Sequence, residues 1–330
     1  MTPRRIVNRL RRTIFGTLYV DRGGGPEDTV FLGGSGRSGT TWLSEVINFD
    51  NSYRYLFEPF HPRYVPQWSG FPERPYLRPT EEHKEALETA RQILSGRIRN
   101  RWIDGFNTKL VGHRRLLKDV RANLFLKWLS AHFPEVPIVF ALRHPCAVVL
   151  SQHRGQRLRE SWPPDLQSLL DQPALVEDHL GPFVPYIREA CSMDLFDQLV
   201  FRWCIENYVP LRQFEAGGLH CVFYERVCLE PEAEIRRLFE SIGRRWDVAA
   251  LRTASRASPM TAQESRIHSA PAASSGLIDG WVERIEPVRV ERTVEILALF
   301  GLDRFYGTEP EPLATPAPTW SGSPRRATSE

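Results

Sequence analysis

Short apolar runs along the chain alternate with longer segments in which apolar residues recur at helical spacing. Four runs have the length and composition of strands, at 29–32, 53–57, 138–142 and 220–225. Helices are predicted between and after them, at 81–99, 122–132, 147–151, 193–214, 231–243 and 288–300. Strands that alternate with helices predict an α/β fold, and we expect a single domain with a central parallel sheet flanked by helices.

A glycine-rich turn, GGSGRSG at 33–39, follows the first strand and leads into a helix with its own apolar face. Such a turn offers backbone N–H groups to a phosphate, because glycine permits close approach and the helix start carries partial positive charge. Arg37 adds a full charge, and the next residues add hydroxyl groups. We therefore predict an anion-binding loop for a phosphate ester. Its candidate binding residues are Gly36, Arg37, Ser38, Gly39, Thr40, Thr41 and Trp42.

The loop differs from that of kinases and nucleotide hydrolases. Gly34 and Gly39 have the spacing of G-x-x-x-x-G-K-[ST], but Thr40 occupies the lysine position. No acidic residue after an apolar strand is recognisable as a magnesium ligand, so magnesium-nucleotide chemistry fits poorly. A P-loop-type kinase or hydrolase is kept as one alternative. A non-catalytic nucleotide-binding protein of the same fold is the other.

Residues 36–43, GRSGTTWL, resemble the phosphosulfate-binding loop of sulfotransferases, which use 3′-phosphoadenosine 5′-phosphosulfate (PAPS). That family's consensus is close to [KR]-S-G-T-[TS]-[WL]. A second family signature, R-[DN]-P-x-x-x-x-x-S, is matched by Arg143, Pro145 and Ser151, with His144 in the Asp/Asn position. The resemblance covers residues 28 to about 306 and implies the P-loop NTPase-like sulfotransferase fold. It also implies that Arg143 and Ser151 bind the 3′-phosphate of PAPS.

The strand at 53–57 ends at Glu58. If this strand lies parallel beside the first, Glu58 emerges at the edge where the glycine-rich loop lies and where such sheets bind ligands. The carboxylate is then either a general base or a structural anchor. In carbohydrate and tyrosylprotein sulfotransferases a glutamate shortly after the loop is the proposed base. Cytosolic sulfotransferases use a histidine instead, so His61 is the competing candidate.

The resemblance implies an in-line transfer of a sulfuryl group to a hydroxyl acceptor, with 3′-phosphoadenosine 5′-phosphate (PAP) leaving. Glu58 is then the base, and Arg37 stabilises the leaving phosphate. Trp42 either stacks on adenine or belongs to the core. No metal is needed, because fixed cationic groups balance the charge. The acceptor, a small molecule, glycan or lipid, is not identified by the sequence.

Two irregular segments, 62–82 and 152–185, are predicted to lie over or beside the acceptor site. Arg154 and Arg157 either contact an anionic acceptor or lie on a solvated surface, and Lys118 faces either the cleft or solvent. In the family a loop corresponding to 252–280 folds over the nucleotide. Here the tryptophan of that loop, Trp281, is kept, but its Arg-Lys pair is missing.

Composition adds limits to this picture. The 330 residues are 42% hydrophobic and 25% charged, as in ordinary globular proteins. A net charge of +3 argues against a nucleic-acid partner. Five cysteines without a C-x-x-C pair predict reduced thiols, a cytoplasmic location and no zinc site.

The ends of the chain differ from the middle. No stretch approaches the roughly 20 apolar residues of a membrane span. Within the N-terminal segment 1–27, residues 4–20 are basic and amphipathic. They either form a helix that packs on the domain or contact an anionic membrane surface. The tail 307–330 is rich in Pro, Ser and Thr and is predicted to be disordered.

Overall fold

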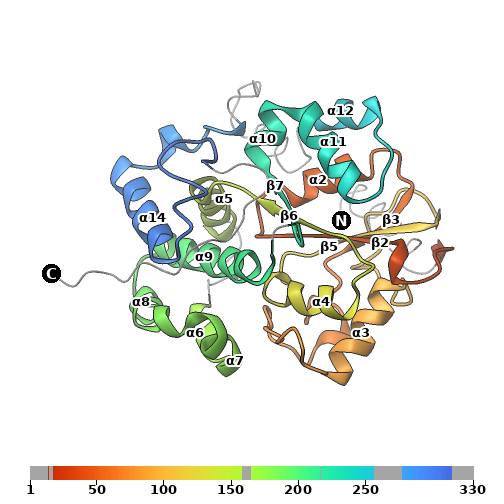
Figure 1. Cartoon of the computed structure of the whole chain (residues 1–330), viewed down its shortest axis with the longest axis horizontal. Helices are drawn as coiled ribbons and strands as arrows, with labels where there is room; N and C mark the ends of the chain where they lie inside the picture. The colour runs from red at the N-terminus through yellow and green to blue at the C-terminus, as the bar shows by residue number, and fades with distance from the viewer. Residues whose placement is uncertain (1–13, 15–17, 158–164, 216, 256–276, 314–330) are drawn as a thin grey trace, which may run out of the picture.

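Five parallel strands form the central sheet of the computed structural model, which describes residues 14, 18–157, 165–215, 217–255 and 277–313 (Figure 1). The strand order is β3-β5-β2-β6-β7. The strands are β3 (Tyr53–Phe57), β5 (Arg114–Lys118), β2 (Thr29–Gly34), β6 (Ile138–Leu142) and β7 (His220–Phe223). Every residue of β2 and β6 is buried, as expected for central strands of a parallel sheet. The predicted α/β class with a parallel sheet is confirmed.

The neighbour of the first strand differs from the expectation. Strand β5, and not β3, pairs with β2, with Lys118 opposite Leu32 on one side and opposite Phe57 on the other. The sequence hid β5 because it contains Arg115, a fully buried arginine whose guanidinium pairs with Asp21 at 2.7 Å. Glu58 therefore lies two strands away from the glycine-rich loop, although at the same edge of the sheet.

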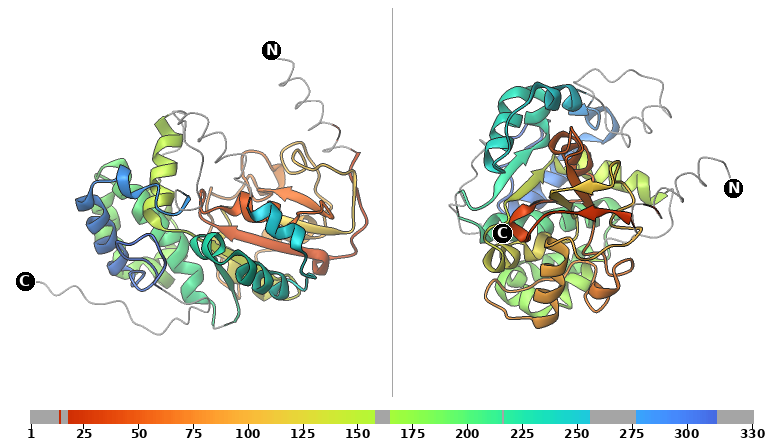
Figure 2. Two further views of the ribbon diagram at one scale, coloured as in Figure 1. Left: turned by 90° about the horizontal axis from the view of Figure 1, so that it is seen from above. Right: turned by 90° about the vertical axis from the view of Figure 1, so that its right-hand side faces the viewer.

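Helices cover both faces of the sheet (Figures 1 and 2). The helices on one face are α2 (Thr40–Ile47), α10 (Tyr224–Leu229), α11 (Pro231–Ser241) and α12 (Val248–Ala254). Those packed into the core on the other face are α3 (Lys84–Leu94), α4 (Leu126–His132), α5 (Pro145–Arg157), α9 (Leu195–Gln213) and α14 (Pro287–Leu299). The predicted strand 220–225 is shorter than expected, because α10 begins at Tyr224.

The segments predicted to be irregular are more ordered than the sequence indicates. The described part of 152–185 is largely helical, continuing α5 and adding α6 (Leu166–Leu170) and α7 (Pro173–Leu175), with α8 (Val184–Ala190) beginning at its end. Segment 62–82 packs on the core through the fully buried Val65 and Trp68. A small parallel pair, β1 (Val20–Asp21) with β4 (Val111–Gly112), lies beside the main sheet.

Several expectations fall on residues that lie outside the description. These are most of the amphipathic segment 4–20, most of the tail 307–330 and most of the predicted nucleotide-covering loop 252–280. None of the helices that are described combines the length and apolar character needed to cross a bilayer.

Candidate active site

The glycine-rich loop turns sharply between β2 and α2, and two glycines allow the turn. Gly34 has φ +138°, and a Cβ there would lie 2.6 Å from the carbonyl oxygen of Ala141. Gly39 has φ +88° at the N-cap of α2, and a Cβ there would lie 2.5 Å from Cδ2 of Tyr224. Both positions are left-handed and tightly packed, so a side chain would displace the loop.

Hydrogen bonds within the loop and from α5 fix its conformation. The N-terminus of α2, which follows the loop, lies at the carboxyl edge of the sheet. Ser38 donates from both its backbone N–H and its hydroxyl to the carbonyl of Ser35, at 3.1 and 2.7 Å. Gln152 donates to the carbonyl of Gly36 at 2.7 Å. The first-turn N–H groups of a helix lack acceptors within the helix, so those at the start of α2 are suited to an anion.

The two sequence motifs meet in space. Nε of Arg37 donates to the Ser151 hydroxyl at 2.7 Å, across 114 positions of sequence. Nη1 of Arg143 donates to the carbonyl of Arg37 at 3.3 Å. The predicted loop residues and the predicted 3′-phosphate residues thus lie at one site, which spans the ends of β2 and β6.

Arg143 is a cation without a carboxylate partner among the described residues. Its guanidinium lies 4.1 Å from the centre of the Tyr224 ring, and its Nη2 donates to the carbonyl of Leu277 at 3.0 Å. Its Nε is buried and has no partner within the described part of the chain. Burying a charge in this way is unfavourable unless an anion completes the site.

His144, the departure from the family signature, accepts a backbone hydrogen bond at the start of α5. Its Nδ1 accepts from the Cys146 N–H at 3.2 Å, as an Asx side chain would two residues before a helical N–H. Burial lowers the pKa of His144 to about 4, so the ring is neutral. We assign its proton to Nε2, which lies 3.1 Å from the carbonyl of Gly307. The ring stacks on Trp281 at 4.3 Å and so connects the C-terminal segment to the start of α5.

Glu58 lies directly after β3 in a left-handed conformation, φ +43°. Its carboxylate accepts from Nζ of Lys118 and from Nη1 of Arg121, both at 2.6 Å. Burial alone would raise the pKa of Glu58, but the charges of Lys118 and Arg121 outweigh it, and the pKa is about 2. Lys118 is therefore buried at the site and does not face solvent.

Arg121 was missed by the sequence analysis, as was its second partner. Nε of Arg121 donates to Glu73 at 2.6 Å, so segment 62–82 reaches the site through a charged contact. Asp119 accepts from the N–H of Arg121 at 2.8 Å and turns the chain after β5. Lys118 is the last residue of β5, and Asp119 and Arg121 come directly after it. The sequence analysis considered Lys118 but not the two charged residues that follow it.

His61, the competing candidate for the base, is neutral, and the lone pair on its Nδ1 is already engaged. Burial and the charge of Arg121 lower the pKa of His61 to about 4, so the ring is neutral. Its Nδ1 accepts from the Arg63 N–H at 3.3 Å, which assigns the ring proton to Nε2 and leaves no free lone pair.

Trp42 lies in the core and is 6% exposed. Its ring meets Tyr224 edge to face at 5.2 Å, and its Nε1 donates to the carbonyl of Ala254. Of the two roles considered for Trp42, these contacts match packing in the core. Stacking on adenine stays a prediction. The side chains of Arg154 and Arg157 lie outside the described residues.

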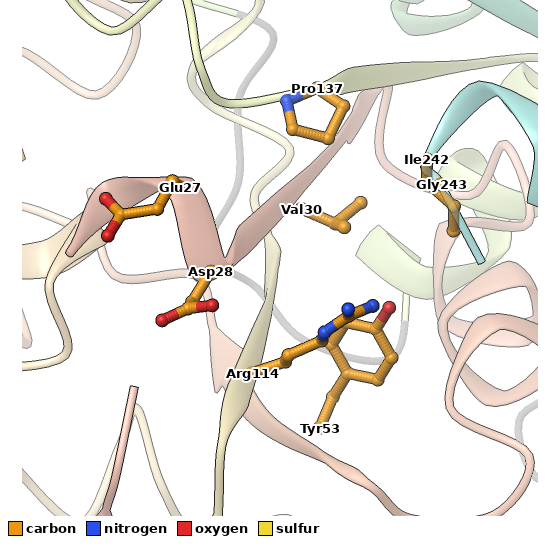
Figure 3. Close-up of a pocket in the computed structure, with 8 residues that line it drawn as sticks. All are labelled: Glu27, Asp28, Val30, Tyr53, Arg114, Pro137, Ile242 and Gly243. Carbon is orange, nitrogen blue, oxygen red and sulfur yellow. The ribbon is translucent and has the colours of Figure 1, made fainter. Parts of the chain in front are cut away.

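A small pocket of about 130 Å³ lies at the opposite edge of the sheet (Figure 3). It is lined at the amino ends of β2, β3 and β5 by Val30, Tyr53 and Arg114. This pocket is separated from the glycine-rich loop by the length of the strands. Across the described residues, no three His, Cys, Asp or Glu side chains are grouped to hold a metal ion.

Comparison with known proteins identifies one family. Residues 29–175 match the model of the sulfotransferase family, a range that includes the glycine-rich loop, Glu58, Arg143 and Ser151. No curated protein gives a significant sequence match.

The chain is also similar in fold to solved structures of sulfotransferases. The sulfotransferase domain from the curacin biosynthetic pathway has a TM-score of 0.45 and 15% identity, covering 84% of this chain and 96% of that one. A sulfotransferase from Mycobacterium avium has a TM-score of 0.43 and 13% identity, covering 87% and 78%. The sulfotransferase domain from the Synechococcus PCC 7002 olefin synthase has a TM-score of 0.39 and 16% identity, covering 81% and 92%.

Proposed function

We propose that the chain is a sulfotransferase that transfers a sulfuryl group from PAPS to a hydroxyl acceptor, a proposal supported by the match of residues 29–175 to the sulfotransferase family model. The observation that carries this proposal is the meeting of the two motifs, in which Arg37 contacts Ser151 and lies beside Arg143. A nucleotide with phosphates at both 3′ and 5′ positions requires two separate anion sites. The start of α2 and the Arg143–Ser151 pair supply them.

The residues present fit PAPS. The buried, unpartnered Nε of Arg143 is suited to a phosphate, which a guanidinium binds with two parallel hydrogen bonds. The backbone N–H groups of 39–41 and the charge of Arg37 would bind the 5′-phosphosulfate. PAPS, when bound, supplies the sulfuryl group and a stable leaving phosphate. Arg37 then stabilises the negative charge that builds on that phosphate, so the proposal requires no metal ion.

Glu58 is proposed as the group that takes the proton of the acceptor hydroxyl. Lys118 and Arg121 keep its carboxylate ionised and fix its position. This makes Glu58 a weak base, so it accepts the proton late, when bonding to sulfur has made the hydroxyl acidic. The same two cations hold positive charge next to the acceptor oxygen.

The location of the reaction is proposed to be the cytoplasm. All five cysteines are free thiols, as expected in a reducing compartment. The acceptor is a small molecule, a glycan or a lipid, and residues 4–20 remain a candidate for peripheral membrane contact.

The test is turnover with PAPS as the donor. The purified full chain is incubated with PAPS labelled in the sulfuryl group, a mixture of hydroxyl acceptors and a metal chelator, and labelled sulfate esters are separated from PAPS. We expect transfer in the presence of the chelator. Phosphoryl transfer from ATP that needs magnesium would instead identify a kinase, and nucleotide binding without any transfer would identify a non-catalytic relative.

A further inference from the structure

Four aromatic rings gather next to Glu58 and form what we call the aromatic surface: Phe57, Tyr64, Trp102 and Phe106. Phe57 lies 4.7 Å from Phe106 and 5.1 Å from Trp102, measured between ring centres. Tyr64 stacks on Trp102 at 4.0 Å. Tyr64 is 43% exposed and Phe106 is 44% exposed, although large apolar rings usually turn inward.

The aromatic surface is directly connected to the groups proposed for proton transfer. Nζ of Lys118, which binds Glu58, lies 4.9 Å from the centre of the Phe57 ring. Nε1 of Trp102 donates to the backbone carbonyl of Glu58 at 3.1 Å. The aromatic surface therefore borders Lys118 and the backbone of Glu58.

The order of the strands separates this surface from the nucleotide site. Arg143 follows β6, on one side of β2, whereas Glu58 follows β3, on the other side (Figure 1). Neighbouring strands lie about 4.8 Å apart, so Glu58 is displaced by roughly 10 Å from the end of β2. A nucleotide that extends from the glycine-rich loop toward Arg143 leaves the β5–β3 side for the acceptor.

The weak basicity of Glu58, the proposed proton acceptor, limits which kinds of hydroxyl group the acceptor substrate can carry. Two ion pairs make Glu58 a poor base. A poor base does not match a sugar or alkyl hydroxyl, whose pKa is close to that of water and far above that of a phenol. A phenol has a pKa of about 10 and releases its proton far more readily. Lys118 and Arg121 would also stabilise the phenolate charge as it forms.

We propose that the acceptor is a phenol whose ring rests on the aromatic surface and whose hydroxyl meets Glu58, an inference that rests on the proposed sulfotransferase function. In the reaction the phenol O–H proton passes to a carboxylate oxygen of Glu58, and the phenolic oxygen bonds to sulfur. The bond from sulfur to the bridging phosphate oxygen breaks, and its electron pair leaves with PAP. The products are an aryl sulfate, PAP and the proton that Glu58 releases to solvent.

The first experiment compares acceptors that share one ring system. The full chain with PAPS is given 2-naphthol or 2-naphthalenemethanol, which place a phenolic or an alkyl hydroxyl on the same flat body. We expect kcat/KM to favour 2-naphthol by about 100-fold or more, a typical size for proton-transfer effects. A tyrosine-containing peptide is run in parallel, because it carries the same hydroxyl on a larger partner and so separates a small-molecule from a peptide source.

The second experiment tests the surface with Tyr64→Ala and Phe106→Ala, two substitutions at exposed positions. Each should raise KM for 2-naphthol about three- to tenfold, the size of one aromatic contact, while kcat and PAP affinity stay unchanged. The matched control is Val288→Ala on α14, a 63% exposed apolar residue on another part of the fold, which should leave KM unchanged.

The outcomes separate this inference from the proposed function. Tight PAP binding with equal or better sulfation of 2-naphthalenemethanol or a sugar, or with no sulfation of any phenol, overturns the phenol inference alone. Unchanged KM values in both surface variants also overturn it. Failure to bind PAP overturns the proposed function as well.

Discussion

The pair between Glu58 and its two cations predicts a large and specific loss of stability when the carboxylate is removed. In Glu58→Gln the volume stays the same, but Lys118 and part of Arg121 become buried charges without a counter-ion. The fall in the pKa of Glu58 from 4.5 to about 2 corresponds to about 3 kcal/mol, since one unit is worth about 1.4 kcal/mol. Breaking a buried pair from one side costs about 3–5 kcal/mol. We therefore expect the free energy of unfolding to fall by about 3 kcal/mol or more.

A second substitution tests whether this loss comes from the unpaired cation. Lys118→Met keeps the length of the side chain and removes the charge, so the double variant Glu58→Gln/Lys118→Met should recover about half of the loss or more. Urea denaturation of the full chain at neutral pH, followed by tryptophan fluorescence, measures all four proteins of the cycle. Losses that simply add would refute the electrostatic account.

The same double variant separates structure from proton transfer. It should be folded and should bind PAP, yet its sulfuryl transfer should be at least about 100-fold slower than that of the natural chain, because no carboxylate takes the proton. Restored transfer in the double variant would exclude Glu58 as the proton acceptor and assign it an anchoring role.

Three further predictions concern the rest of the site. Gly39→Ala should weaken PAP binding at least about tenfold, because the added Cβ would meet Tyr224. The control Gly243→Ala, at φ +60° with open space around it, should lower the free energy of unfolding by only about 1–2 kcal/mol and leave PAP binding unchanged. Calorimetry measures the binding, and urea denaturation measures the stability. His144→Asn should keep the contact to the Cys146 N–H and lose that to Gly307, so PAP affinity should fall less in His144→Asn than in His144→Ala; equal losses would contradict the capping role. For pH, the folded pKa of Glu58 lies below its unfolded value, so its contribution to stability should be complete above about pH 4.5 and decline as the pH falls toward 2. Urea denaturation measures this decline. If the stability of Glu58→Gln falls equally over the same pH range, the decline comes from other groups.

Local patterns in the sequence predicted the loop and the helix start that we propose to bind the nucleotide. The glycine-rich loop and the Arg143–Ser151 pair each lie within one strand-turn-helix unit, so their spacing alone indicates their place at the edge of the sheet. The structure brings the two units together through Arg37 and Ser151.

The surroundings of Glu58, where we propose that the acceptor binds, depend on tertiary contacts and were less predictable. Strand β5 was hidden because its arginine, Arg115, is neutralised by Asp21, a residue 94 positions away. The partners of Glu58 lie at the end of that strand and just after it, so missing the strand also hid the pairing with Lys118 and Arg121. Segment 62–82 carried no periodicity, although Glu73 reaches the site from it. Charges that pair over long sequence distances look like surface residues until the fold is known.

The most direct test of the account is a calorimetric titration of the full chain with PAP in the absence of added metal, beside the Arg143→Ala variant. We predict binding at micromolar concentrations that Arg143→Ala weakens by about tenfold or more, the expected size for a lost charge-assisted pair. AMP, which lacks the 3′-phosphate, should bind much more weakly and should not distinguish the two proteins. No binding of PAP, or equal binding of PAP by the Arg143→Ala variant, would contradict the assignment of this site to PAPS.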